Sequence, residues 1–175
     1  MKNYKGNSAY NMVFIFIMTI VFYSCDSKKE PYQLPDNAVE LLTNNTSKTW
    51  KLAKRINNGH RMNMGDCFLS YRITYSANYS VKDNNAEHND CGPSMKTQWK
   101  FVTNKNASFI KWSSESLKEL MKTEKPYKYF TLVSISKNEL IVKYEHQQFS
   151  NRKLIITDYL VPEYVEVEGR DFHNK

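Results

Sequence analysis

The chain has 175 residues and a formal net charge of +7 at pH 7, from 25 Lys and Arg against 18 Asp and Glu. This length suits one domain with its own hydrophobic core. The basic residues are dispersed from Trp50 to Lys175, which is typical of a solvated surface and not of a clustered basic groove. Composition therefore argues against nucleic acid as a partner.

The start of the chain carries the features of an export signal. Two lysines precede an apolar run over residues 12–23, which is shorter than the roughly 20 residues that a membrane-spanning helix needs. A small residue, Ser24, then precedes Cys25. This order predicts a bacterial lipoprotein signal peptide over residues 1–24, cleaved before a Cys25 that carries acyl chains such as palmitate.

Two alternatives to a lipoprotein signal stay open, an ordinary cleaved secretion signal and an uncleaved anchor. Phe22 and Tyr23 stand where a lipoprotein signal usually has Leu and a small residue. Residues 25–35 are mostly polar with two prolines and are interpreted as a tether. We expect a protein anchored by lipid in the cell envelope, at the outer rather than the inner membrane, with the face left open.

The next segment, residues 36–161, is predicted to be one all-β domain. Asp36 is placed to cap a short helix that ends at Thr43. From Thr49 on, apolar and polar residues alternate as in half-buried strands, and residues 114–122 interrupt them with a helical pattern. About eight such strands at spacings of eight to twelve residues predict an antiparallel up-and-down β-barrel. The remaining residues, 162–175, are interpreted as a loose polar tail.

The alternation also predicts which side chains face the barrel interior, because a shift of one residue would turn each set outward. The predicted inward residues are Trp50, Leu52, Tyr71, Ile73, Trp99, Phe101, Leu140 and Val142. Lys54 is the one basic residue in phase with an inward set, whereas Arg72 and Lys100 are out of phase. The interior of an eight-stranded barrel is large enough to be filled by side chains or to hold one small ligand.

Three cysteines occur, and if Cys25 carries lipid, Cys67 and Cys91 remain as a pair. An oxidising compartment favours a disulfide between them. The alternative is a metal site that adds Asp66 and His88 to these cysteines, but no further metal-binding motif accompanies them.

Motifs of catalysis are not found. The sequence has no Gly-rich phosphate loop, no G-x-S-x-G and no H-E-x-x-H, so we expect neither an enzyme nor a cofactor. Aromatic residues are the remaining feature, and they could line a ligand cavity or fill the core. The candidate ligand-binding residues are Tyr71, Tyr75, Tyr79, Trp99, Phe101 and Trp112.

A resemblance to a known family rests on several short fragments that follow one another in a characteristic order. They are Thr49-Trp50-Lys51-Leu52, Asp66-Cys67, Tyr71-x-Ile73, Asn78-Tyr79-Ser80, Cys91, Trp99-x-Phe101, Phe130-x-Leu132-x-x-Ile135 and Leu140-x-Val142. The chain resembles, over residues 47–161, the lipocalin-like domain of small lipoproteins of Gram-negative bacteria. The resemblance implies the barrel fold, and it transfers no catalytic residue.

Two functions are compatible with these expectations. The first is a membrane-tethered barrel that binds a small apolar or amphipathic molecule, since the predicted inward residues include no cluster of charges. The second is a filled barrel that contacts a protein partner of the envelope through its loops at residues 82–97 and 113–126.

Overall fold

The computed structural model describes residues 32–121, 124–147 and 153–171. They belong to a compact unit, Pro31–Lys175, which is distinct from a second unit, Met1–Glu30. The predicted signal peptide and residues 25–31 of the tether, Cys25 included, lie outside the described residues. No helix in the described ranges is long and apolar enough to cross a membrane.

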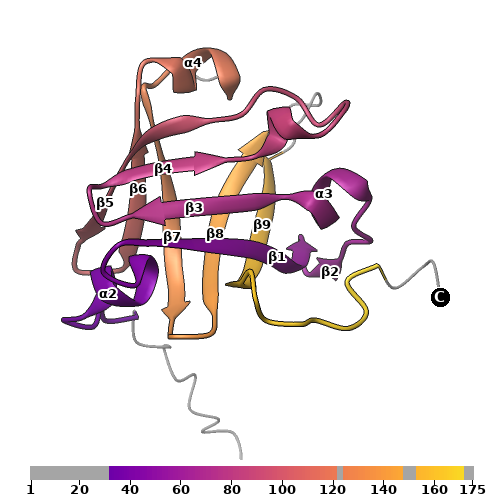
Figure 1. Cartoon of the computed structure of the whole chain (residues 1–175). Coiled ribbons are helices and arrows are strands. Elements are labelled where there is room, and N and C mark those ends of the chain that lie inside the picture. The colour runs from indigo at the N-terminus through magenta and orange to yellow at the C-terminus, as the bar shows by residue number, and fades with distance from the viewer. Residues whose placement is uncertain (1–31, 122–123, 148–152, 172–175) are drawn as a thin grey trace, which may run out of the picture. The chain divides into compact units, whose positions relative to one another are not determined.

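Strands dominate the described chain (Figure 1). The elements in chain order are α2 (Ala38–Thr43), β1 (Ser47–Asn57), β2 (His60–Arg61), α3 (Asp66–Ser70), β3 (Arg72–Ser76), β4 (Ser80–Asp83), the 3-10 helix η1 (Asn85–Glu87), β5 (Lys96–Thr103), β6 (Ser108–Ser113), α4 (Ser116–Leu120), β7 (Tyr127–Ile135), β8 (Leu140–Gln147) and β9 (Lys153–Pro162).

The sheet closes on itself. Strands follow the order β2-β1-β3-β4-β5-β6-β7-β8-β9, and β1 also pairs with β9, so β1 and β3 to β9 form a closed ring of eight antiparallel strands. The short β2 pairs antiparallel with the last two residues of β1 and is not part of the ring. The predicted fold class, an antiparallel up-and-down barrel with a short N-terminal helix, is confirmed.

One end of the barrel is covered by α2 and the residues before it (Figure 1). The indole N–H of Trp50, inside the barrel, donates a buried hydrogen bond of 3.0 Å to the carbonyl oxygen of Leu42. The hydroxyl of Tyr32 donates to the carbonyl oxygen of Ile135 at the end of β7. The predicted helix is therefore present, but its N-cap is Asn37 and not Asp36. We refer to this side of the barrel as the closed end.

The predicted interior is largely confirmed by burial. Trp50, Leu52, Ile73, Trp99, Leu140 and Val142 are buried, and Tyr71 and Phe101 are half-buried against the same core. The alternation from Leu69 predicted that a strand begins there. Leu69 instead belongs to α3, and Tyr71 lies between α3 and β3. The helical pattern after Ser114 is α4, whose Leu117 is fully buried.

An irregularity in β1 overturns the expectation for Lys54. Leu52 pairs with Leu160 of β9, whereas Lys54 pairs with the adjacent Tyr159, so the register shifts by one residue at Ala53. Such a bulge reverses which side chains face inward. Lys54 consequently lies outside, with its Nζ 3.9 Å from the centre of the Tyr159 ring, and its neighbour Arg55 faces the interior.

The C-terminal segment is less loose than predicted. Within its described part, the guanidinium of Arg170 donates hydrogen bonds to the carbonyl oxygens of Leu52 and Leu69 at 2.8 and 2.9 Å. Arg170 thus links the C-terminal segment to β1 and to the end of α3.

Candidate functional site

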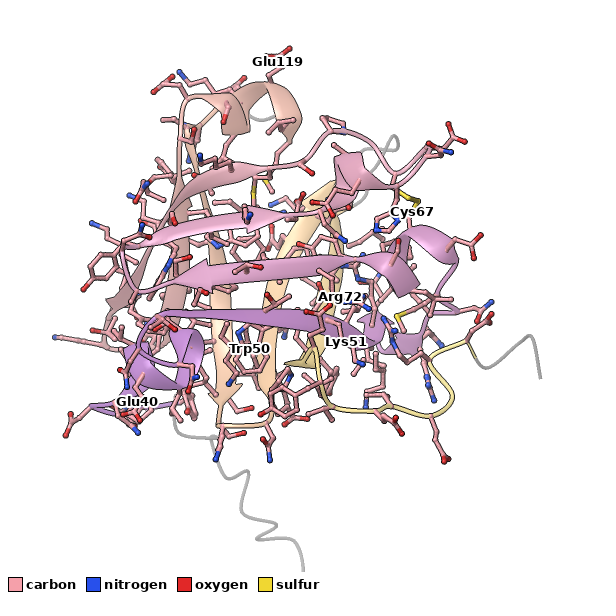
Figure 2. The ribbon with its side chains drawn as sticks, in the orientation of Figure 1. Glu40, Trp50, Lys51, Cys67, Arg72 and Glu119 are labelled. Carbon is pink, nitrogen blue, oxygen red and sulfur yellow. A yellow bond between two sulfur atoms is a disulfide. The ribbon has the colours of Figure 1, made fainter. Side chains whose placement is uncertain are left out.

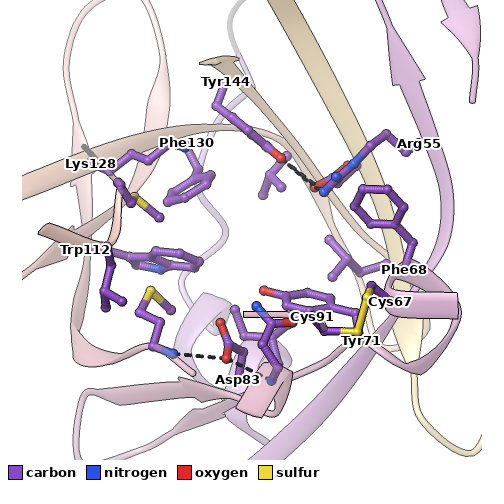
Figure 3. Close-up of a pocket in the computed structure, with 18 of the residues that line it drawn as sticks. Arg55, Cys67, Phe68, Tyr71, Asp83, Cys91, Trp112, Lys128, Phe130 and Tyr144 are labelled. Carbon is purple, nitrogen blue, oxygen red and sulfur yellow. Dashed lines mark hydrogen bonds and ion pairs between the residues drawn. A yellow bond between two sulfur atoms is a disulfide. The ribbon is translucent and has the colours of Figure 1, made fainter. Parts of the chain in front are cut away.

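The barrel contains a cavity, and none of the residues that line it belongs to α2 (Figure 3). The cavity, of about 520 Å³, opens between α3, α4 and the segment from β4 to β5. Its volume is within the range of small-molecule sites. It is lined by residues from seven strands, from α3 and from the position between α3 and β3; they include Arg55, Phe68, Tyr71, Tyr75, Asp83, Trp112, Lys128, Phe130, Tyr144 and Asp158.

Aromatic rings form much of the cavity wall. Trp112 of β6 and Phe130 of β7 lie with ring centres 4.2 Å apart, and Phe130 meets Tyr144 of β8 edge to face at 5.1 Å. Tyr75 of β3 stands beside Trp112 at 6.4 Å. This wall offers a ligand apolar contact area, with hydroxyl and indole groups at defined points.

An ion pair lies in the same wall. The Arg55 guanidinium donates to both carboxylate oxygens of Asp158, at 2.6 and 2.7 Å. The hydroxyl of Tyr144 lies 3.1 Å from both Arg55 Nη2 and Asp158 Oδ2. Burial disfavours the charge of Arg55, but its hydrogen bonds to Asp158 together with the electrostatic interactions with Tyr144, Asp158 and Tyr71 outweigh this and raise its pKa. Arg55 and Asp158 thus satisfy each other, as charges in an interior must.

Lys128 of β7 is a second cation in the wall, and it lacks such a partner (Figure 3). Its Nζ lies 4.4 Å from the ring centre of Tyr144 and 5.2 Å from that of Phe130. No carboxylate of the described residues lies within ion-pair distance of it. Burial lowers the pKa of Lys128 to about 8, with Asp158 opposing the shift and Arg55 adding to it.

Asp83, at the end of β4, lies on the other side of the cavity (Figure 3). Its Oδ1 accepts hydrogen bonds from the backbone N–H groups of Met95 at 3.0 Å and Asn85 at 3.2 Å. Burial raises the pKa of Asp83, and these hydrogen bonds counteract the rise. This carboxylate therefore organises the segment at the cavity mouth.

The predicted disulfide between Cys67 and Cys91 is present, with Cα atoms 5.3 Å apart. It connects α3 to the segment between β4 and β5, and both cysteines border the cavity. Because the two sulfurs are bonded to each other, they cannot serve as the thiolate ligands of the alternative metal site.

The six candidate aromatic residues divide between cavity and core. Tyr71, Tyr75 and Trp112 line the cavity. Trp99 and Phe101 do not, since they pack edge to face in the filled part of the barrel with ring centres 5.3 Å apart. Tyr79 is 51% exposed and stacks on Trp99 from the β3–β4 turn.

Sequence reasoning missed the charged part of the wall. In β9, Asp158 is in phase with the buried Ile156 and Leu160, and in β7, Lys128 is in phase with the buried Phe130. The alternation of these strands could therefore have predicted that Asp158 and Lys128 face inward. Arg55 could not be found in this way, because the bulge at Ala53 places it inward.

No family model matches the sequence, and no curated protein matches it. Among solved structures, the crystal structure of a lipocalin-like protein from Bacteroides uniformis ATCC 8492 is similar, with a TM-score of 0.41 and 11% identity over 65% of this chain and 94% of that chain. A similarity of this degree does not indicate a function. The barrel fold is established by the strand pairing of this chain alone.

Proposed function

We propose that this protein is a lipid-anchored binding protein of the cell envelope that holds a small amphipathic molecule inside its barrel. The observation that carries the proposal is the cavity of about 520 Å³, with aromatic rings and a polar group of side chains in one wall. An apolar ligand body would bury against the rings, and its polar end would find hydrogen-bonding partners. The cavity also argues against the alternative of a completely filled barrel.

The polar wall refines the ligand class. Arg55, Asp158 and Lys128 place charges where the sequence predicted none, so a purely apolar ligand would leave them desolvated without a partner in the ligand. An amphipathic ligand avoids that cost. The role is binding and not catalysis, in line with the missing catalytic motifs.

The lipid anchor at Cys25 and the location at the outer membrane belong to the same proposal. They rest on the charged start, the short apolar run and the Ser24-Cys25 junction. The described chain begins at Tyr32, whose hydroxyl donates a hydrogen bond to the carbonyl oxygen of Ile135 in β7 at the closed end.

Native mass spectrometry of the full-length protein purified from its host tests the binding function. We expect a bound species of small-molecule mass that is released on unfolding. Phe130→Ala should lower the occupancy of the bound species, because it removes part of the cavity wall. The control is Phe109→Ala on the neighbouring β6, whose side chain is half-buried and lies outside the cavity. This variant should keep the wild-type occupancy. Equal occupancy in the two variants would contradict a site in the cavity.

The anchor needs a separate test. Metabolic labelling with a palmitate analogue should mark the wild-type protein, and its intact mass should lack residues 1–24. Cys25→Ala should abolish the label, and a Cys25→Ala protein that is still labelled would rule out this attachment site.

A further inference from the structure

Two hydrogen-bond donors in the cavity wall have no ordinary acceptor among the described residues. The first is Nζ of the half-buried Lys128, which lies over the rings of Phe130 and Tyr144. The second is Trp112 Nε1, which is buried and makes no hydrogen bond of ordinary length and angle, although it interacts weakly with the neighbouring Tyr75 hydroxyl. Unpaired buried donors are rare in folded proteins, and each calls for an explanation.

The two residues that carry these donors are direct neighbours in the sheet. Trp112 of β6 and Lys128 of β7 occupy opposite positions in the β6–β7 register, and both side chains line the cavity. Opposite residues of an antiparallel pair have Cβ atoms about 5 Å apart. One small group in the cavity is therefore able to accept hydrogen bonds from both side chains at once.

The charges of the wall determine what that group should be. Arg55 is already neutralised by Asp158, which leaves Lys128 as the one unpaired charge among the three. A single negative charge would balance it. A second negative charge would meet the carboxylates that also line the cavity, Asp83, Asp90 and Asp158, without a cation to pair with.

We propose that Lys128 and Trp112 bind the carboxylate of an amphipathic monoanion, with the ammonium and the indole N–H donating to its oxygens. The apolar body of the ligand then lies against Phe130 and Tyr75. This inference rests on the proposed binding function and specifies the head group that the cavity selects.

Three probes with the same twelve-carbon chain test it: dodecanoate, dodecanol and dodecyltrimethylammonium. Their affinities are measured by isothermal titration calorimetry on the full-length protein, solubilised without alkyl-chain detergent, at pH 7. The variant is Lys128→Met, which keeps most of the apolar stem. The matched control is Lys143→Met, a lysine that is exposed on the adjacent β8. Any partitioning of a probe into residual lipid is the same for the wild type and the two variants, so it does not affect the comparison between them.

We expect dodecanoate to bind about tenfold or more tightly than dodecanol to the wild type, as for a charge-assisted hydrogen bond. Lys128→Met should remove this preference, whereas Lys143→Met should keep it. Dodecyltrimethylammonium should bind more weakly than dodecanol to the wild type, because its charge repels Lys128.

Contrary outcomes are distinguishable. Equal affinity of dodecanoate and dodecanol for the wild type would overturn the head-group assignment and leave the binding function intact. A lack of binding by all three probes would count against the binding function for chain-like ligands, and the assignment would fall with it. If Lys128→Met does not fold, Trp112→Phe serves as the second variant, since it removes only the indole N–H. It should lower affinity for dodecanoate and not for dodecanol, and equal losses would overturn the assignment.

Discussion

Arg55 of β1 and Asp158 of β9 form a two-point ion pair inside the barrel, with N–O distances of 2.6 and 2.7 Å. Their strands are first and last in the barrel and close it by pairing with each other. The ion pair thus spans the seam where the ends of the domain meet, and Tyr144 of β8 hydrogen-bonds to both partners.

This ion pair predicts a strong asymmetry between single and double variants. Asp158→Leu leaves the Arg55 charge buried without a partner and should lower the free energy of unfolding by about 3 to 5 kcal/mol. Combining it with Arg55→Met should recover most of this loss, because no buried charge then remains. Urea unfolding followed by tryptophan fluorescence measures both. Glu145→Gln, in the exposed pair with Lys153, is the control and should change stability by no more than about 1 kcal/mol.

Lys128 predicts a dependence of stability on pH. Its pKa falls from 10.5 in the unfolded chain to about 8 in the folded protein, so the unfolded state binds more protons between these values. The free energy of unfolding should therefore rise as pH increases from 8 to 10.5, by up to about 3 kcal/mol from this group. The difference between wild type and Lys128→Met, measured by urea unfolding across this range, isolates the effect.

Several titratable or charged groups face Lys128. They are Arg55, Asp158, Tyr144 and His146, with Asp83 across the cavity. Burial raises the pKa of Tyr144 above its ordinary value and lowers that of His146 below its own, so neither titrates within this window in the folded protein. A stability difference that stays constant from pH 8 to 10.5 would show that Lys128 is not desolvated.

The Cys67–Cys91 disulfide closes a loop over a sequence separation of 24 residues. In the chain-entropy account, such a loop contributes roughly 3 kcal/mol to stability. Dithiothreitol should therefore lower the urea midpoint of the wild type. The Cys67→Ser Cys91→Ser protein should show the lower midpoint from the start and should not respond to the reductant. A reductant-sensitive midpoint in the double variant would assign the effect to another group.

The hydrogen bond from Trp50 to Leu42 predicts a role for α2 in closing the barrel. Trp50→Phe removes the indole N–H and leaves the buried Leu42 carbonyl without this donor, at a cost of about 1 to 3 kcal/mol. Phe101→Leu also changes a ring that packs on the core, but this ring makes no such bond to α2, and it serves as the comparison. Hydrogen exchange of the α2 amides should increase in Trp50→Phe and remain unchanged in Phe101→Leu.

Much of the barrel could be predicted because period-two alternation is a local property of the sequence. The inward orientation of Ile73 and Leu140 is predicted correctly from their neighbours alone. The cavity could not be predicted in the same way, since an inward aromatic residue such as Trp99 in the core and one such as Trp112 at the cavity have the same parity. What distinguishes the core position from the cavity position is its distance from the ends of the barrel.

Short elements and irregular pairing account for the remaining errors. The five-residue helix α3 gives too few turns for a helical period to stand out from the strand that follows it. The placement of Arg55 depends on a bulge that forms only when β1 meets β9, at a separation of about a hundred residues in the chain. Such a pairing is decided by the closed barrel and not by local preference.

The bulge at Ala53 decides which basic residue of β1 faces the barrel interior. If β1 paired with β9 without a bulge, Ala53 would lie opposite Tyr159 and Lys54 opposite Asp158, so Lys54 would face the interior in place of Arg55. Two barrels of the same composition can therefore enclose different side chains. Gain or loss of a bulge within a strand, rather than substitution, is an economical evolutionary route from one interior to another.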